Sequence, residues 1–471
     1  MSKETKLLKN TAIIAVGNIC TKCISFFMLP LYTALLSTND YGTVDMITTY
    51  TSLLVIILNF QLEQGIFRYL IETRGNKQKQ KEYITSVFCF LIAVNMTVLI
   101  AGGFVLSRFK YQYTAYLLIN IFISVFNSVT LAIPRGLGDN TTYAIGSCIN
   151  GSFQVILNVI FIAYLHFKVE GMLVAGMLAM LASMVYIFSR IKLWRYIKLS
   201  GFSKSSLKEI MSYSLPLIPY TLTWWIMSAS NRMVINVFLG TSFNGIFAVA
   251  NKFPSLFSMV TNIFQMSWLE SASENVNDEG REKYYQSVMD KTIRFYSSSN
   301  LLIIAAIPLV FGFLINENFA NSYKYIPILM TGAMFHSITS LYGSIYFAFK
   351  ETKSIAKTTI FSAIINVVIS LTLIKVIGLY AAALSTMIAN ISVAVVRHFD
   401  IKRMVNIKIS KKYMLSEILV YGIVLVGYYI NVQYVQLLIF LIIIPICFFK
   451  NKELVYSTID LLRKRLRVIG R

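Results

Sequence analysis

The chain has 471 residues, of which 56% are hydrophobic and 14% charged, and its mean hydropathy is +0.65. Apolar stretches of membrane-spanning length recur along nearly the whole sequence, which is typical of a polytopic α-helical membrane protein. The formal net charge of +22 is high enough for a nucleic-acid partner. However, the cations lie in short clusters between apolar stretches, so they indicate membrane topology and exclude a soluble nucleic-acid-binding protein.

Hydropathy predicts an all-α membrane protein with about fourteen transmembrane helices. Their centres lie near residues 24, 54, 95, 124, 155, 182, 226, 256, 303, 337, 367, 388, 421 and 441. The first apolar stretch begins near Asn10 and is too long for the core of a cleavable signal peptide. We therefore expect the first helix to act as its own insertion signal.

The distribution of Lys and Arg predicts the orientation. With the N-terminus inside, the cytoplasmic segments hold 35 of the 43 Lys and Arg residues. The external loops hold five, namely Arg108, Lys110, Lys168, Lys324 and Lys375. This asymmetry places both termini in the cytoplasm. All external loops are short, which leaves no space for a folded catalytic module outside the membrane.

An internal repeat relates the first six predicted helices to the second six. At a shift of 203 residues the matched pairs include Asn18 with Thr221, Ser25 with Ser228, Thr38 with Thr241, Gly42 with Gly245 and Asn59 with Asn262. Further along, a shift near 207 matches Gly171 with Gly378 and Arg190 with Arg397. Because each copy has an even number of helices, the copies keep the same orientation and are expected to be related by a pseudo-two-fold axis along the membrane normal.

This repeat predicts three parts of the chain. Residues 1–200 and 201–405 are each expected to form a six-helix lobe, with a central cavity between the two bundles. Residues 406–471 are expected to add two further helices and a basic cytoplasmic tail.

Polar stripes mark four of the predicted helices. The first helix carries Asn18, Lys22 and Ser25 at helical spacing, and the seventh carries Thr221, Trp225, Ser228, Arg232 and Asn236. The second carries Asp45, Thr48, Ser52, Asn59 and Glu63, and the eighth carries Lys252, Ser255 and Asn262. Hydrogen bonding between helices explains the uncharged residues equally well. For the charged residues the alternative is a buried ion pair, such as Asp45 with Lys252.

The deep cations predict an anionic ligand. A cation near the bilayer centre costs roughly 2.5–3.5 kcal/mol, so it is expected to face an aqueous cavity or a partner. Lys22, Arg232 and Lys252 lie at mid to outer depth, while Arg68 and Glu63 mark the inner mouth. By simple counting the cavity is net positive, and protonation of either acid would make it more so.

Two segments carry a family resemblance. Residues 26–32 (FFMLPLY), followed by Leu36, Ser37, Tyr41 and Gly42, resemble the first-helix signature of polysaccharide exporters of the Wzx type. Residues 378–383 (GLYAAA), which follow Asn366, are similar to the eleventh and twelfth helices of the same family. This family belongs to the multidrug/oligosaccharidyl-lipid/polysaccharide superfamily, which includes the MATE-like transporters. The resemblance covers roughly residues 5–450.

The resemblance implies a flippase of the bacterial cytoplasmic membrane. It would move undecaprenyl-diphosphate-linked oligosaccharide repeat units from the inner to the outer leaflet by alternating access, for capsule, exopolysaccharide or O-antigen assembly. We expect the substrate to be bound by Lys22, Arg232, Lys252, Arg68, Asn18, Ser228, Asn262 and Trp225. Asp45 and Glu63 are the candidates for coupling to protons or sodium. A monomer that works alongside a polymerase and glycosyltransferases is expected.

Other functions stay open or are disfavoured. A lipid II-type flippase is a close alternative, whereas a MATE-like multidrug or cation antiporter is expected to have an acid-dominated pocket. A membrane polymerase or glycosyltransferase needs a large external loop or a nucleotide-sugar module, and an ATP-driven pump needs a Walker loop. The sequence has none of these features, so we disfavour these functions. Cys20 and Cys23 have no second Cys or His pair at metal-binding distance in the sequence. We therefore expect no enzyme activity, no cofactor and no metal.

Overall fold

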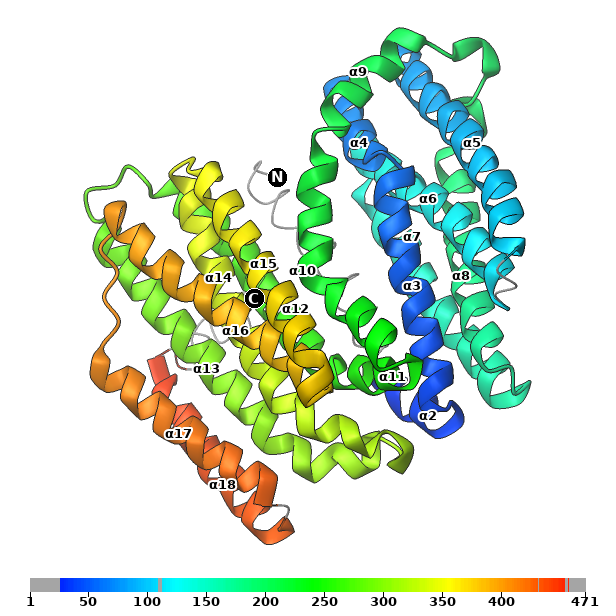
Figure 1. The fold of residues 1–471 in the computed structure, drawn as a ribbon. Coiled ribbons are helices and arrows are strands. Elements are labelled where there is room, and N and C mark those ends of the chain that lie inside the picture. Colours follow the sequence, from blue (N-terminus) through cyan, green and yellow to red (C-terminus); the bar gives the residue numbers. More distant parts are fainter. Residues whose placement is uncertain (1–25, 109–111, 431, 454–455, 457–471) are drawn as a thin grey trace, which may run out of the picture. The chain divides into compact units, whose positions relative to one another are not determined.

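The computed structural model describes residues 26–108, 112–430, 432–453 and 456. Over these residues the chain is built from helices and contains no strand, which confirms the predicted all-α fold (Figure 1). Every predicted helix centre from residue 54 onward lies inside a helix. Ten helices of the described part are long and apolar enough to cross a membrane, so the chain is a multi-pass membrane protein. The helix expected near residue 24 lies mostly outside the described residues.

The chain divides into two compact units, residues 1–245 and 246–471, and each is described by itself. The predicted lobe boundaries at residues 200 and 405 stay predictions. The first unit contains α2 (Leu29–Leu35), α3 (Thr38–Leu58), α4 (Leu62–Glu72), α5 (Lys77–Ser107), α6 (Thr114–Leu137), α7 (Asn140–Asn158), η1 (Val159–Tyr164), α8 (Val169–Ile191), η2 (Leu193–Arg195), η3 (Leu199–Gly201), α9 (Lys204–Ser214), α10 (Leu217–Phe238) and the first half of α11 (Thr241–Ala250).

Helix α3, which carries most of the second polar stripe, begins with a capping box. Oγ of Ser37 accepts a hydrogen bond from the backbone N–H of Asp40 at 3.1 Å, and the Asp40 carboxylate accepts one from the backbone N–H of Ser37 at 3.2 Å. These bonds satisfy two donors that the start of a helix otherwise leaves free. The capping box therefore fixes where α3 begins, two turns before Asp45.

Two glycines let α3 and α11 approach each other closely. A Cβ atom on Gly42 would lie 2.0 Å from the carbonyl oxygen of Thr241, and one on Gly245 would lie 2.0 Å from that of Thr38. These four residues are the pairs that the 203-residue repeat matches. In this reciprocal contact the glycine of each helix lies against the threonine of the other helix. A local two-fold axis produces such a contact.

The apolar core of the first unit lies among α4, α5 and α6. Leu62, Ile66 and Leu70 of α4 are fully buried there, together with Ile84 and Val87 of α5. A second cluster joins α3 to α6 and α8, with Ile47 at its centre. Because α3 buries this apolar face, its polar stripe is directed elsewhere, and α10 packs against α3.

The second unit contains the rest of α11, α12 (Lys252–Glu274), α13 (Arg281–Leu314), η4 (Glu317–Tyr325), α14 (Ile326–Ala348), α15 (Thr352–Ile377), α16 (Leu379–Asp400), η5 (Ile401–Arg403), α17 (Lys411–Ile430) and α18 (Gln433–Lys450). Helix α14 is the most buried and packs against α12 and α16. Helices α17 and α18 both contact α13 and lie at the edge of this unit (Figure 1).

Hydrogen bonds between helices hold the second unit together. Nε1 of Trp268 on α12 donates to the carbonyl of Leu341 on α14 at 3.2 Å, and Nδ2 of Asn300 on α13 donates to the carbonyl of Met330 at 2.9 Å. In a membrane the lipid offers no hydrophobic gain for helix association, so such polar contacts carry part of the packing energy. Large apolar side chains such as Phe313, 86% exposed, and Val376, 77% exposed, face outward, as a lipid-facing surface requires.

Candidate functional site

The predicted polar stripe of α3 faces the predicted polar stripe of α10. Nε1 of Trp225 donates a hydrogen bond to Oγ of Ser52 at 2.8 Å, and Oγ1 of Thr221 donates one to the Gln61 side chain at 3.1 Å. Trp225 and Thr221 are one turn apart on α10, so the two contacts are successive steps along the same face. These contacts make α3 and the turn after it neighbours of α10, and they are the hydrogen bonds between helices that the sequence analysis gave as the alternative to a ligand-binding role.

Further along the same face, Arg232 and Asp45 form an ion pair. Nε of Arg232 lies 3.1 Å from Oδ2 of Asp45, and the two side chains are 30% and 18% exposed. The Nε–H bond lacks hydrogen-bond geometry with any described residue, so the contact is a charge pair. Asp45 thus pairs with Arg232 of the seventh predicted helix, and this pair removes one cation and one acid from the sequence-based charge count.

Asn244 of α11 completes this group. Its Nδ2 donates to Oδ2 of Asp45 at 3.0 Å and to the backbone carbonyl of Gly42 at 3.3 Å, and the side chain is fully buried. Asn244 therefore fixes the orientation of the carboxylate that holds Arg232. Sequence reasoning missed this residue because α11 is short and has no polar stripe. The repeat match of Gly42 with Gly245, its neighbour, was the signal that could have found it.

The second polar stripe is interrupted between α3 and α4. Phe60 and Gln61 have φ angles of 53° and 55°, in the left-handed region that residues other than glycine rarely adopt. Gln61 is 4% exposed and is the acceptor for Thr221 of α10. Each such residue costs on the order of 1–3 kcal/mol and persists only where its surroundings enforce it. The break turns the chain so that Glu63 follows Asn59 on the same side.

Glu63 is an acid in a largely buried position. Nδ2 of Asn59 donates to a carboxylate oxygen of Glu63 and also to Oγ of Ser128 on α6, at 2.8 Å. Glu63 lies in α4, beyond the end of the candidate span Thr38–Leu58. Burial raises the pKa of Glu63 from its ordinary value to about 7. This carboxyl group can therefore gain or lose a proton near neutral pH.

The other predicted site residues lie in several places. Arg68 is 56% exposed, and its Nη2 lies 2.9 Å from a carboxylate oxygen of Glu72 on the same helix. Lys252 is the first residue of α12, and Asn262 is exposed further along that helix. Ser228 belongs to α10, between Trp225 and Arg232. Asn18 and Lys22, together with Ser25 and the Cys20 and Cys23 pair, lie outside the described residues.

Among the described residues, no group of His, Cys, Asp and Glu is arranged to hold a metal ion. The described cysteines, Cys89, Cys148 and Cys447, are free thiols. The chemistry of the α3–α10 face is therefore that of one guanidinium, two carboxyl groups and neutral hydrogen-bonding side chains. With one cation and two acids, these described groups together carry no net positive charge, and Arg232 is already paired with Asp45.

Comparisons with known proteins identify the family and the fold of the chain. The family model described as "Polysaccharide biosynthesis protein" matches residues 7–269. The Lsg locus putative protein 1 of Haemophilus influenzae is 25% identical to the chain over 239 residues, which are 49% of this chain and 57% of that protein. The chain thus matches little more than half the length of this curated relative.

Two solved structures share the fold. The lipid II flippase MurJ in an inward closed conformation has a TM-score of 0.70 at 15% identity, covering 94% of this chain and 100% of that one. A multidrug resistance MATE family transporter of the MOP superfamily in an inward-facing conformation has a TM-score of 0.66 at 17% identity, covering 83% and 98%. The predicted class of fold is confirmed by these likenesses, which at such identities concern the fold alone.

Proposed function

Because the chain belongs to the polysaccharide biosynthesis protein family, we propose that it is a flippase for undecaprenyl-diphosphate-linked oligosaccharide repeat units. It moves them from the inner to the outer leaflet of a bacterial cytoplasmic membrane, by alternating access, for the assembly of capsule, exopolysaccharide or O-antigen. The observation that carries this proposal is Arg232, a partly exposed cation on the polar face of α10 that is held in place by Asp45.

Arg232 suits the diphosphate of such a lipid. The diphosphate carries about two negative charges, which cannot enter hydrocarbon without compensation. A guanidinium group presents five N–H donors in a planar fork and binds phosphate through two of them at once. The contact with Asp45 is made through Nε. The two terminal nitrogens are therefore the part of the fork assigned to the phosphate, while the carboxylate keeps the group oriented.

The remaining predicted residues take supporting roles in the proposal. Lys22 and Lys252 add positive charge, and Arg68 attracts the diphosphate at the cytoplasmic mouth. Asn18, Ser228, Asn262 and Trp225 meet the sugars, because carbohydrates are bound through hydrogen-bonding and aromatic side chains. In the described structure the indole N–H of Trp225 already donates to Ser52, so a sugar hydroxyl would have to replace that acceptor.

The driving force has two sources in this proposal. With the cell interior negative, outward movement of two negative charges is favoured by about 4.6 kcal/mol per 100 mV. Proton exchange at Glu63, whose pKa burial raises to about 7, adds a second source, with Asp45 as the other candidate carboxylate. Sodium in place of protons is the alternative for the same two acids.

The test is export of surface polysaccharide in a host that lacks its own flippase. We expect Arg232→Gln to lower export roughly 10- to 100-fold at equal protein level, which is the loss of one charge-assisted contact. Arg232→Lys keeps the charge but loses the fork, so it should restore export only in part. Arg190→Gln, at an exposed position of α8, is the matched control and should export normally. Normal export by Arg232→Gln would contradict the proposal.

The same cells distinguish the alternatives that the sequence left open. A MATE-like antiporter would raise resistance to cationic drugs on overexpression without restoring surface polysaccharide. A lipid II-type flippase would rescue growth when the host's own peptidoglycan precursor flippase is depleted. Either result in place of restored polysaccharide export would reassign the substrate.

A further inference from the structure

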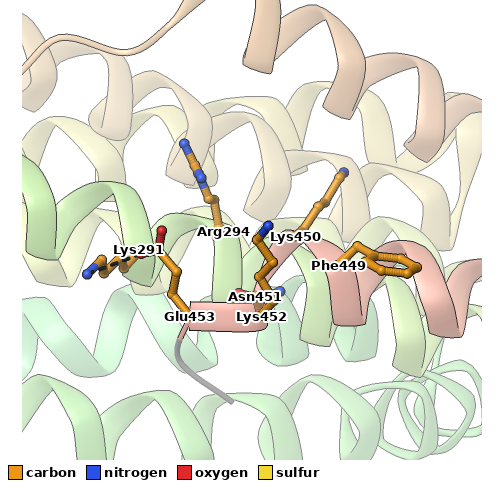
Figure 2. Close-up of a pocket in the computed structure, with 7 residues that line it drawn as sticks. All are labelled: Lys291, Arg294, Phe449, Lys450, Asn451, Lys452 and Glu453. Atoms are coloured by element: carbon orange, nitrogen blue, oxygen red, sulfur yellow. Dashed lines mark ion pairs between the residues drawn. The ribbon is translucent and has the colours of Figure 1, made fainter. Parts of the chain in front are cut away.

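The second unit contains a cationic pocket made of residues other than those of α3 and α10. A pocket is formed where the first half of α13 meets the end of α18 and the residues that follow it. Its lining residues are Lys291, Arg294, Phe449, Lys450, Asn451, Lys452 and Glu453 (Figure 2). Four of these seven side chains are cations and one is an acid, so the pocket has a strong excess of positive charge.

The charges are only partly compensated by neighbouring acids. Lys291 pairs with Glu453 at 3.4 Å, and both side chains are largely exposed, at 48% and 73%. Lys450 pairs with Glu417 of α17 at 2.5 Å, and this pair is mostly buried, at 20% and 12% exposure. With both acids counted against the four cations, the pocket keeps a net charge of +2. Arg294 and Lys452 provide this excess.

The pocket is held in shape by contacts behind it. The guanidinium of Arg294 lies 5.4 Å from the ring centre of Tyr413 on α17, at cation–π distance. Nδ2 of Asn451 donates to Oγ of Ser298 on α13 at 2.8 Å, which joins the end of α18 to α13. In Figure 2 the Lys291–Glu453 pair lies at one end of the group and Phe449 at the other. Three helices therefore position the cations.

The sequence around the pocket places it at a membrane surface. Residues 295–316, directly after Arg294, contain no charged side chain, and neither do residues 418–449, directly before Lys450. At 1.5 Å per residue the first run is about 33 Å long, enough for the hydrocarbon core. Both helices thus change from apolar to charged at the level of the pocket. Phe449 is 69% exposed at this boundary, where it would lie against acyl chains.

The geometry points to a binding site in this pocket for the phosphate group of an anionic membrane lipid. Basic pockets between membrane helices at the headgroup level bind such groups. The bound phosphate, which carries one negative charge in a phosphodiester lipid, offsets half of the +2 excess of Arg294 and Lys452 and fastens the α17–α18 pair to α13. A free phosphate ion shares the chemistry, but the apolar boundary and Phe449 favour a ligand with acyl chains. The site is separate from the one proposed for the transported substrate.

The test measures lipid retention by the full-length purified protein. Native mass spectrometry compares bound phosphatidylglycerol with bound phosphatidylcholine after delipidation and titration with each lipid. We expect the double variant Arg294→Gln with Lys452→Gln to bind phosphatidylglycerol roughly 10- to 30-fold more weakly, for two cations lost at a membrane surface. The matched control, Lys283→Gln with Lys353→Gln, loses the same charge at exposed positions outside the pocket and should bind normally.

Two further arms complete the experiment. The variant Arg294→Lys with Lys452→Arg keeps both charges and should retain the lipid, which separates loss of charge from misfolding. Inorganic phosphate at the same concentration as lipid phosphate should not displace phosphatidylglycerol. Equal retention by the neutral variant and its control would overturn the proposal. Displacement by inorganic phosphate would overturn the assignment to a lipid.

Discussion

Two arginines on long helices of this chain differ in burial and in the partners of their guanidinium groups. Arg397 of α16 is 4% exposed, and its guanidinium donates to neutral oxygens of α14 and α15: Oγ1 of Thr358 at 2.9 Å, the Thr339 carbonyl at 2.9 Å, Oγ1 of Thr359 at 3.1 Å and the Ile355 carbonyl at 3.4 Å. Arg232 of α10 has a side chain that is 30% exposed and pairs with one carboxylate through Nε.

The difference separates a structural cation from the cation that we propose binds the ligand. Every nitrogen of the Arg397 fork is directed at a protein acceptor, so this arginine joins three helices and has no donor directed at a ligand. Arg232 is oriented by a carboxylate and is partly accessible, so its terminal nitrogens can meet an anion. Charge and depth in the sequence do not distinguish the two cases, whereas burial and hydrogen-bond partners do.

The largest expected effect is on stability, at Arg397. We expect Arg397→Leu to lower the free energy of unfolding by about 3 kcal/mol or more, because it leaves several buried oxygens without donors. Thermal unfolding of the purified protein in detergent measures this loss. Arg190→Leu, at the repeat-related exposed position, should change stability by less than about 0.5 kcal/mol. Similar losses in both variants would contradict a structural role specific to Arg397.

The next largest effect is expected from two glycine substitutions that disturb the Arg232 site without changing any charge. We expect Gly42→Ala and Gly245→Ala each to cost about 1–3 kcal/mol, because the new Cβ would lie 2.0 Å from a backbone oxygen and must push α3 from α11. Gly42 is one turn before Asp45, so export should fall as well. In Gly103→Ala the added carbon meets no atom within 4 Å, and this control should keep both stability and export. Unequal effects of the two site glycines would argue against the reciprocal contact.

A smaller effect is expected on the pH dependence of stability, at Glu63. Since burial raises the pKa of Glu63 to about 7, the protein should lose stability as pH rises through that value, where a charge forms in a buried site. Between about pH 6 and 8 the loss is on the order of 1 kcal/mol. Glu63→Gln should remove this pH dependence, and Glu72→Gln, at an exposed ion pair, should retain it. Parallel pH profiles for wild type and Glu63→Gln would refute the shifted pKa.

The smallest effect is expected at Trp225. Trp225→Phe keeps the aromatic ring but removes the N–H that donates to Ser52. One hydrogen bond contributes about 0.5–1.5 kcal/mol, so stability and export should fall only slightly. Trp194→Phe, 54% exposed in the described structure, is the control for the loss of an indole elsewhere. A loss of export as large as that of Arg232→Gln would mean that the indole N–H contributes as much to substrate binding as the Arg232 guanidinium does.

The helices and the polar faces were predictable from sequence because both depend on local periodicity. Each predicted helix centre from residue 54 onward lies in a helix, whereas the short helices α4, α9 and α11 were not predicted. Spacing located the polar stripes of α3 and α10. The repeat also predicted which residues of α3 and α11 correspond. Their reciprocal approach through Gly42 and Gly245 was not predicted, because a match between repeats does not say which residues touch.

The partners of the charged residues were not predictable in the same way. Helical spacing defines a face but not the neighbour of that face, so Asp45 had Lys252 as an equally reasonable partner until the structure paired it with Arg232. Arg397 was matched with Arg190 by the repeat, but the sequence did not predict that neutral partners bury it. The turn at Phe60 and Gln61 lacks the glycine that usually marks a positive φ.

The most direct measurement is flipping of a fluorescent undecaprenyl-diphosphate oligosaccharide in proteoliposomes. We expect Arg232→Gln to slow flipping at least about tenfold, the loss of one charge-assisted contact, when equal amounts of folded protein are compared. Arg190→Gln should flip at the wild-type rate. Equal flipping rates for Arg232→Gln and Arg190→Gln would contradict the assignment of the Arg232 guanidinium to the diphosphate.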